Sequence, residues 1–149
     1  MTRLPLLLAA MALAGLGISG YLTIAHWGKT PIVCAAVGDC EFVNASAYAT
    51  LGGLPVSGLG ALAYVGLTAA AVAWWVRRDD ERLPILYWGV ALAGFGYAAY
   101  LTYIELFVLK AVCVWCMTSA ALLTVSLILS TMALLRESAD LRTARPSQQ

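Results

Sequence analysis

Four long apolar runs constrain the fold of this chain more than any other feature of its sequence. They extend over residues 4–27, 58–76, 83–109 and 112–135. A helix needs about 20 residues to cross the hydrocarbon core of a bilayer, and each run is close to that length or longer. The strands of a closed β-barrel would alternate apolar and polar residues, and none of the runs alternates. The sequence therefore predicts an all-α protein, an integral membrane four-helix bundle.

The composition excludes several other classes of protein. Hydrophobic residues make up 62% of the 149 residues and charged residues 11%, whereas a soluble domain has about a quarter of its residues charged. A chain this small has no core large enough to bury the apolar excess, so a soluble enzyme is excluded, as is a disordered chain. Nine basic and eight acidic residues do not form the basic excess that nucleic-acid binding requires, so no nucleic acid is expected as a partner.

The basic residues predict the orientation of the spans in the cell (inner or plasma) membrane. Seven of the nine lie at the N-terminus, between the second and third runs, or in the tail at residues 136–149: Arg3, Arg77, Arg78, Arg82, Arg136, Arg142 and Arg145. The other two links contain only Lys29 and Lys110. Because basic residues are retained on the cytoplasmic side, both termini are expected there, with the loop at residues 28–57 capping the bundle outside. Glu105 is expected to reach the outer interface as a helix-end residue.

Two further features have ordinary explanations. Residues 1–20 are compatible with a cleaved signal peptide, which would leave three spans with the same loops outside, but the apolar stretch is long for one. Small residues in the first and third runs are expected to allow close helix packing; these are Gly15, Gly17, Gly20, Gly89, Gly94 and Gly96. No repeat or linker indicates a second domain, and the tail after Arg136 is expected to be frayed.

All four cysteines of the chain are predicted to lie on the oxidising, exoplasmic side, where disulfides form. Cys113 and Cys116 form a CxxC sequence at the start of the fourth run, and residues three apart on a helix project from one face. The N–H groups at a helix N-terminus, with Lys110 one turn earlier, are expected to favour a thiolate there. A lowered thiol pKa is the condition for nucleophilic disulfide exchange.

The other two cysteines, Cys34 and Cys40, enclose a Gly-Asp turn at residues 38–39 and are expected to close a small, mobile loop disulfide. Three other interpretations are two structural disulfides, a four-cysteine zinc or iron–sulfur site, and unrelated buried thiols. The five-residue spacer of the loop pair does not fit a metal site built from CxxC pairs, so no metal is expected. A relay in which the two pairs pass electrons is favoured.

Such a relay needs an electron acceptor. The chain has no flavin or dinucleotide fingerprint, and its single histidine, His26, excludes haem held by two histidines; it is expected to be an interfacial anchor. A CxxC at the head of a membrane helix is within reach of a lipid-soluble quinone. Phe107 and Trp115 are the residues expected to line a quinone pocket, although they also fit an ordinary aromatic belt.

The order of these motifs resembles the vitamin K epoxide reductase (VKOR) family in its bacterial form. The resemblance rests on the wide loop pair, the segment CEFVNASAYA at residues 40–49, the segment LPVSGLG at residues 54–60, and a CxxC that opens the last span. It covers nearly the whole chain. DsbB, another four-helix disulfide oxidase, is similar in plan but carries its CxxC in the first outer loop, so the order here favours the VKOR relatives.

The resemblance implies a four-helix bundle around a quinone (menaquinone, ubiquinone or phylloquinone), capped by a loop that includes a short helix. It implies that Cys40 exchanges with Cys113, that Cys116 reduces the quinone, and that Ser46 matches a serine or threonine near the active site. Many bacterial members carry a fused thioredoxin-like domain that this chain lacks, so a separate DsbA-like or thioredoxin-like exoplasmic protein is expected as the donor. Animal members tend to have Asn and Tyr at the places of Val56 and Ala120, which favours simple quinone reduction over epoxide reduction here.

The resulting hypothesis is a quinone-dependent thiol oxidase that supports disulfide formation in exported proteins. Either loop cysteine is a candidate for first contact with the carrier. Two alternatives from other classes remain: a membrane scaffold protein with structural disulfides, and an outward-directed reductase of thiols or quinone epoxide that uses the same cysteines with reversed electron flow.

Overall fold

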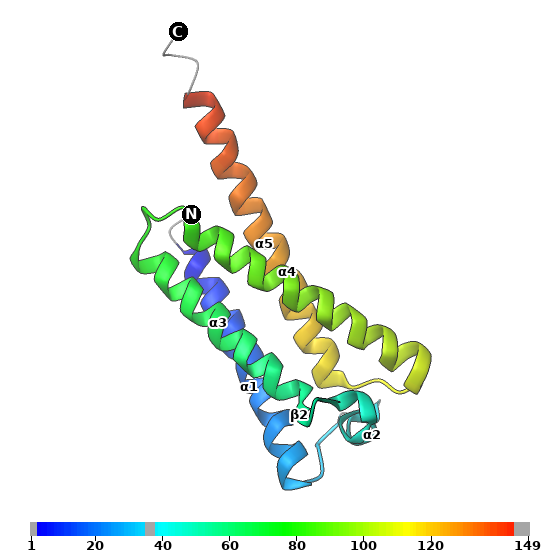
Figure 1. Ribbon diagram of the computed structural model, residues 1–149. Coiled ribbons are helices and arrows are strands. Elements are labelled where there is room, and N and C mark those ends of the chain that lie inside the picture. The colour runs from blue at the N-terminus through cyan, green and yellow to red at the C-terminus, as the bar shows by residue number, and fades with distance from the viewer. Residues whose placement is uncertain (1–2, 35–37, 145–149) are drawn as a thin grey trace.

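Four long helices form the body of the molecule (Figure 1). The computed structural model describes residues 3–34 and 38–144, with side chains described up to residue 140. The long helices are α1 (Leu4–Gly28), α3 (Val56–Val76), α4 (Arg82–Tyr103) with its π-helical continuation η2 (Ile104–Leu109), and α5 (Val114–Ala144). All four are long and apolar enough to cross a membrane, which confirms the predicted all-α class and number of spans.

The end of α5 differs from the expectation. The apolar run stops at residue 135, but the helix continues to Ala144, so residues 136–144 are helical and not frayed. After the apolar run the sequence becomes rich in charged residues, but Arg, Glu, Leu and Ala all favour the helical backbone. The apolar pattern therefore located the bilayer-spanning part of the helix, and helix propensity carried the backbone further.

The segment between α1 and α3 folds into a small cap at one end of the bundle. It contains α2 (Cys40–Ala45), the single 3₁₀ turn η1 (Ala47–Ala49), and two short strands, β1 (Thr50–Leu51) and β2 (Leu54–Pro55). The strands pair antiparallel with Leu51 opposite Leu54. Figure 1 shows this cap at the end of the bundle opposite the N-terminus and the α3–α4 link.

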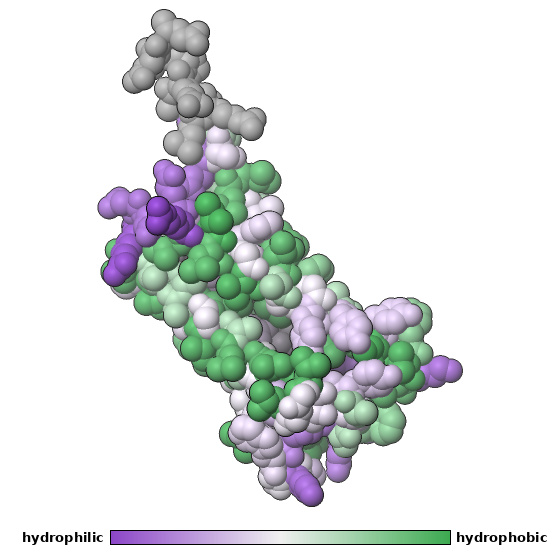
Figure 2. Space-filling view, in the orientation of Figure 1, coloured by the Kyte–Doolittle hydropathy of each residue, from purple (hydrophilic) through white to green (hydrophobic). Residues whose placement is uncertain are grey.

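The surface between the two ends is apolar. Figure 2 shows hydrophobic residues over the flanks of the helices, with hydrophilic residues at the α3–α4 link and at the cap. Large side chains on the flanks are exposed, for example Leu62 at 70% and Ile128 at 53%. In water such a surface would favour aggregation, and in a bilayer it faces acyl chains.

The helices pack through small residues and interhelical hydrogen bonds. Tyr64 of α3 lies against α1, where a Cβ at Gly15 would overlap its ring. The Tyr64 hydroxyl lies 2.8 Å from the Ser119 Oγ of α5 and donates to its carbonyl at 3.0 Å. In α4, Trp88 Nε1 donates to Thr131 of α5 at 2.9 Å. These contacts hold the bundle where hydrophobic exclusion between helices is weak.

Close packing explains only some of the glycines for which it was expected. A Cβ at Gly15 would overlap Tyr64, and one at Gly94 would lie 3.2 Å from Leu123. A Cβ at the other four expected positions meets nothing within 4 Å in the described part of the chain; these are Gly17, Gly20, Gly89 and Gly96. For those four, packing inside the bundle is the wrong explanation.

The contrast between two glycines of α1 provides a matched test. Gly15→Ala forces the methyl group into the Tyr64 ring, and overpacking of this kind costs about 1–3 kcal/mol. We expect a lower thermal unfolding midpoint in detergent micelles, whereas Gly17→Ala leaves the midpoint unchanged or slightly raised because alanine favours helix. Equal midpoints for both variants would contradict the α1–α3 packing described here.

Candidate functional site

The CxxC sequence begins at a helix cap and not inside the helix. α5 starts at Val114, so Cys113 is the residue before it and Cys116 lies in its first turn. Cys113 is the N-cap residue of α5 and accepts two hydrogen bonds from its first turns. Its carbonyl accepts from Met117 N–H at 3.0 Å, and its Sγ accepts from Cys116 N–H at 3.4 Å. The expected placement of both cysteines inside the helix is corrected by one residue, since α5 begins just after Cys113; the two cysteines still lie next to each other.

The loop pair is a disulfide. Cys34 and Cys40 are bonded, with Cα atoms 6.0 Å apart, whereas Cys113 and Cys116 are free thiols. Cys40 is the first residue of α2, whose N-terminus is capped by Asp39: the carboxylate accepts from Phe42 N–H at 3.3 Å. Residues 35–37 of the loop lie outside the described residues. Cys34 is half-buried, and Cys40 is 1% exposed.

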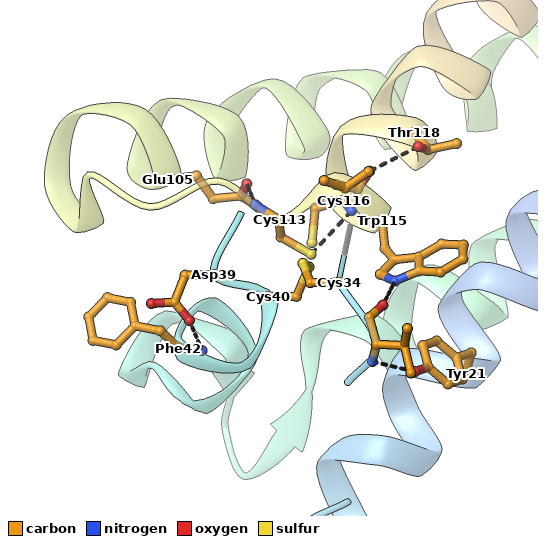
Figure 3. Close-up of a disulfide and its surroundings, with 12 residues drawn as sticks. Tyr21, Cys34, Asp39, Cys40, Phe42, Glu105, Cys113, Trp115, Cys116 and Thr118 are labelled. Atoms are coloured by element: carbon orange, nitrogen blue, oxygen red, sulfur yellow. Dashed lines mark hydrogen bonds between the residues drawn. A yellow bond between two sulfur atoms is a disulfide. The ribbon is translucent and has the colours of Figure 1, made fainter. Parts of the chain in front are cut away.

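One backbone hydrogen bond joins the two pairs. Asp39 N–H donates to the carbonyl of Val112 at 3.0 Å, so the residues that precede Cys40 and Cys113 are directly connected. Cys40 and Cys113 are both buried in one cluster with Val43, and Figure 3 shows the Cys113 sulfur on the side of the Cys34–Cys40 disulfide. Gly38 permits this approach, because a Cβ there would lie 2.8 Å from the Val112 carbonyl oxygen. The structure thus brings all four cysteines together.

Trp115 connects α5 to the loop. Its Nε1 donates to the carbonyl of Val33 at 2.9 Å, and its ring packs edge-on against Tyr21 of α1, with centroids 5.6 Å apart. The Tyr21 hydroxyl in turn accepts from Val33 N–H at 3.0 Å. Two aromatic residues from different helices therefore hold the backbone next to Cys34.

One further contact seats the cap on α1, and another closes the end of α2. The His26 Nδ1 lies 2.9 Å from the carbonyl of Asn44, and because a carbonyl only accepts, this nitrogen carries the hydrogen. His26 therefore anchors α2, which is a more specific role than the interfacial one expected. Ser46 ends α2, and its Oγ donates to the Val43 carbonyl at 2.7 Å.

A cavity of about 430 Å³ lies beneath the cap, between the helices. Cys116 lines it, together with Ser46 from the cap, Tyr64 from α3 and Tyr97 from α4. Its volume falls within the range of about 300–1,000 Å³ for small-molecule sites, which are mostly apolar with a few polar groups. Of the four cysteines, only Cys116 is among the lining residues in the described part of the chain.

The two aromatic residues expected at a quinone pocket do not line this cavity. Phe107 is 65% exposed and stacks on Tyr103 at 4.9 Å between centroids, so it faces outward. Trp115 hydrogen-bonds the loop at Val33, as described above. Ser46, the third expected contact, does line the cavity. An aromatic pattern in the sequence does not distinguish the two sides of a helix.

Glu105 is the residue of the site that sequence reasoning missed. It was expected to reach the interface, but it is 4% exposed. Its Oε2 accepts from Cys113 N–H at 3.1 Å, its carboxyl group interacts with the Cys116 side chain, and it lines the cavity. An acid eight residues before a cysteine has no sequence signature, although an ionisable residue inside a span was itself a signal of function.

The surroundings of Cys113 favour its thiolate. The hydrogen bond with the Cys116 side chain lowers the Cys113 pKa, and the backbone N–H groups of Cys116 and Trp115 act in the same direction, while burial and the charge of Glu105 oppose them. The charge of Glu105, which the sequence did not suggest, thus acts on this thiol. A thiolate at Cys113 is equipped for disulfide exchange.

The arrangement is able to perform thiol–disulfide exchange between a loop disulfide and a dithiol that borders a cavity. No group of three or more His, Cys, Asp or Glu side chains suited to a metal ion occurs among residues 3–34 and 38–140. A family model described as the vitamin K epoxide reductase family matches residues 6–131 of the chain. The matched region includes all the helices of the site and the four cysteines.

The low pKa of the Cys113 thiol is testable with two substitutions of its neighbour. Cys116→Ser keeps a hydrogen-bond donor and Cys116→Ala removes it, and in both variants Cys113 is the only free thiol. We expect the serine variant to hold more Cys113 thiolate at a given pH, measured by the ultraviolet absorbance of the thiolate during titration. Coincident titration curves would show that the side-chain hydrogen bond is not the cause of the lowered pKa.

Proposed function

This chain belongs to the vitamin K epoxide reductase family, and from that premise we propose that it is a thiol oxidase that passes electrons from an exoplasmic dithiol carrier to a membrane quinone. Its family makes it a membrane oxidoreductase of thiols and disulfides. The observation that carries the finer proposal is the division of the CxxC: Cys113 lies in the cluster with Cys40, and Cys116 lines the cavity.

The proposed electron path runs through mixed disulfides. A carrier thiolate attacks Cys34, which releases Cys40; Cys40 then attacks Cys113 of the Cys113–Cys116 disulfide and releases Cys116. The second carrier thiol frees Cys34, which attacks Cys40 and releases Cys113. The loop disulfide is then restored and the CxxC is a dithiol, which is the redox state of the described structure. The direction of each exchange follows the reduction potentials of the pairs.

The exposure of the loop cysteines supports the order of the first step. Cys34 is half-buried, while Cys40 is 1% exposed beneath the cap. A thioredoxin-fold carrier, DsbA-like or thioredoxin-like, reaches the more accessible sulfur of a disulfide more readily. We therefore place first contact at Cys34, a choice that the sequence had left open.

The cavity fits a quinone ring. Most of its lining is apolar, and its polar groups at the capped end include Ser46, Glu105 and Cys116, so a flat apolar ring with hydrogen-bonding oxygens suits it. When bound, a quinone supplies an acceptor for two electrons and two protons. Menaquinone, ubiquinone and phylloquinone all meet this description.

The lining also favours simple quinone reduction over epoxide reduction. Val56 and Ala120 both line the cavity, at the places where the resemblance to animal members implies Asn and Tyr. Opening an epoxide requires a proton donor at its oxygen, and these two side chains offer none. This is the reason to prefer quinone reduction over epoxide reduction, two reactions that both take their electrons from the CxxC dithiol.

Purified protein in micelles tests the proposal directly. With a reduced thioredoxin-fold dithiol carrier and a soluble quinone, we expect the quinone absorbance to fall as the carrier becomes oxidised. Carrier reduction at the expense of a quinol would instead indicate the outward-directed reductase, and no electron transfer in either direction would favour the scaffold protein. Cys116→Ala should abolish quinone reduction and accumulate a Cys40–Cys113 bridge on non-reducing gels, with Cys113→Ala as the matched control that lacks this bridge.

The orientation of the site is a second proposal, based on the distribution of basic residues across the links. The cap, with all four cysteines, is placed outside and both termini in the cytoplasm. In intact cells treated with a reductant, a membrane-impermeant maleimide should label Cys34, whereas Ser138→Cys in the α5 extension should be labelled only after the membrane is opened. Labelling of Ser138→Cys in intact cells would overturn this orientation.

A further inference from the structure

Glu105 is a buried acid whose surroundings are unusual for a membrane span. It is 4% exposed and lies within the span at Arg82–Leu109. An ionisable group in an apolar interior costs several kcal/mol unless it is paired or hydrogen-bonded, and such residues usually mark a functional path. Its partners here are the two members of the CxxC: it accepts from Cys113 N–H, and its carboxyl group interacts with the Cys116 side chain, with which it lines the cavity.

The local backbone is arranged around this residue. The last turn of the third span is π-helical, Ile104–Leu109, and the Glu105 carbonyl accepts from both Lys110 N–H and Ala111 N–H. Short π-helical insertions in α-helices frequently occur at functional sites. Here the wider turn keeps Glu105 pointing inward, while Phe107, two residues further, is exposed.

A structural role alone does not account for a carboxyl group at this position. The Cys113 N–H needs one acceptor, and a neutral amide provides that without burying an ionisable group. The carboxyl group has a second oxygen, and Glu105 lines the same cavity as Cys116. Glu105 thus lies beside the Cys116 thiol, which must lose a proton, and borders the cavity, where that proton is needed.

We propose that Glu105 is a catalytic acid–base residue that takes the proton from Cys116 Sγ and delivers it to an oxygen of the electron acceptor in the cavity. This inference rests on the proposed function. It assigns a proton path to a reaction whose electron path runs through the cysteines.

The step is balanced in atoms and electrons. The Cys116 S–H bond breaks and a Glu105 O–H bond forms; that proton then passes to the acceptor oxygen, and Glu105 returns to a carboxylate. As the Cys113–Cys116 S–S bond forms, the two thiols lose two electrons and two protons in total, one proton by way of Glu105 and one from Cys113. The acceptor, a quinone, is reduced to the hydroquinone.

The other titratable groups around this acid come from four of the packed segments. The turn before α5 carries Cys113, the α3 and α4 linings contribute Tyr64 and Tyr97, and the cap contributes Tyr48, while α1 contributes only Ile18, Ser19 and Leu22 to the cavity. Cys113 and Cys116 are the titratable residues that interact with Glu105, Cys113 through its backbone N–H and Cys116 through its side chain. Glu105 and Cys116 are therefore expected to titrate as a coupled pair.

Glu105→Gln separates the proton role from the structural one, because the amide oxygen still accepts from Cys113 N–H but cannot take up a proton. In single-turnover experiments with the reduced CxxC and a soluble quinone, we expect disulfide formation to slow by about 10²-fold, the usual scale for loss of an acid–base group. Reduction of the loop disulfide by the carrier should keep its wild-type rate. Glu41→Gln, at an exposed acid of the cap, is the matched control and should retain both rates.

A second readout needs no quinone. In a Cys113→Ala background with the loop disulfide intact, Cys116 is the only free thiol, and its alkylation by N-ethylmaleimide is followed against pH. We expect a two-step profile with Glu105 present and a single step in Glu105→Gln. A single step with Glu105 present, or the same profile in both proteins, overturns the inference, even where Glu105→Gln folds poorly.

The two readouts distinguish the inference from the function on which it rests. If the wild-type CxxC is not oxidised by quinone while the alkylation profiles differ, the proposed function fails and the Glu105–Cys116 coupling stands. If wild-type oxidation proceeds and Glu105→Gln matches it within twofold, the catalytic role of Glu105 is overturned and the proposed function stands.

Discussion

The hydrogen bond from Cys113 N–H to the buried carboxyl group of Glu105 is the interaction on which the geometry of the site depends. The chain must reverse direction between η2 and α5 at an apolar level, where an unsatisfied N–H is costly. Glu105 satisfies three donors of this reversal: its carbonyl accepts from residues 110 and 111, and its side chain accepts from residue 113. These hydrogen bonds fix the Cys113 backbone as the N-cap of α5, and the positions of the Cys113 and Cys116 sulfur atoms depend on that backbone.

The cap is held to this reversal by contacts that approach the loop disulfide from several helices. Asp39 N–H reaches the Val112 carbonyl, Trp115 of α5 and Tyr21 of α1 hold Val33, and His26 holds Asn44. None of these contacts involves a sulfur atom. Each sulfur is therefore free to change partners during exchange while the surrounding backbone keeps the two pairs adjacent.

The sequence predicted the spans and the gathering of the cysteines, because both follow from local patterns. A span must be apolar over its whole length, and the basic residues of the links sort the loops by side, which is enough to place Cys34 and Cys113 together. It did not predict the burial of Glu105, which depends on how the chain reverses direction over the eight residues up to Cys113. It also did not predict the outward orientation of Phe107, since aromatic residues occur on every side of a helix. The α5 extension was missed because the prediction followed the apolar run, and residues that favour helix continue beyond the end of that run.

The position of Cys113 just outside α5 also explains why two cysteines three residues apart differ in their contacts. If both cysteines were helical, their side chains would share one face and would meet the same surroundings. With Cys113 as the N-cap residue, its side chain is buried in the cluster with Cys40 and Val43, while Cys116, in the first turn, packs against that cluster and also lines the cavity. The two sulfurs remain close enough for the Cys116 N–H to reach Cys113 Sγ at 3.4 Å. The start of α5 thus lies between the cluster that contains Cys40 and the cavity, and Cys116 borders both.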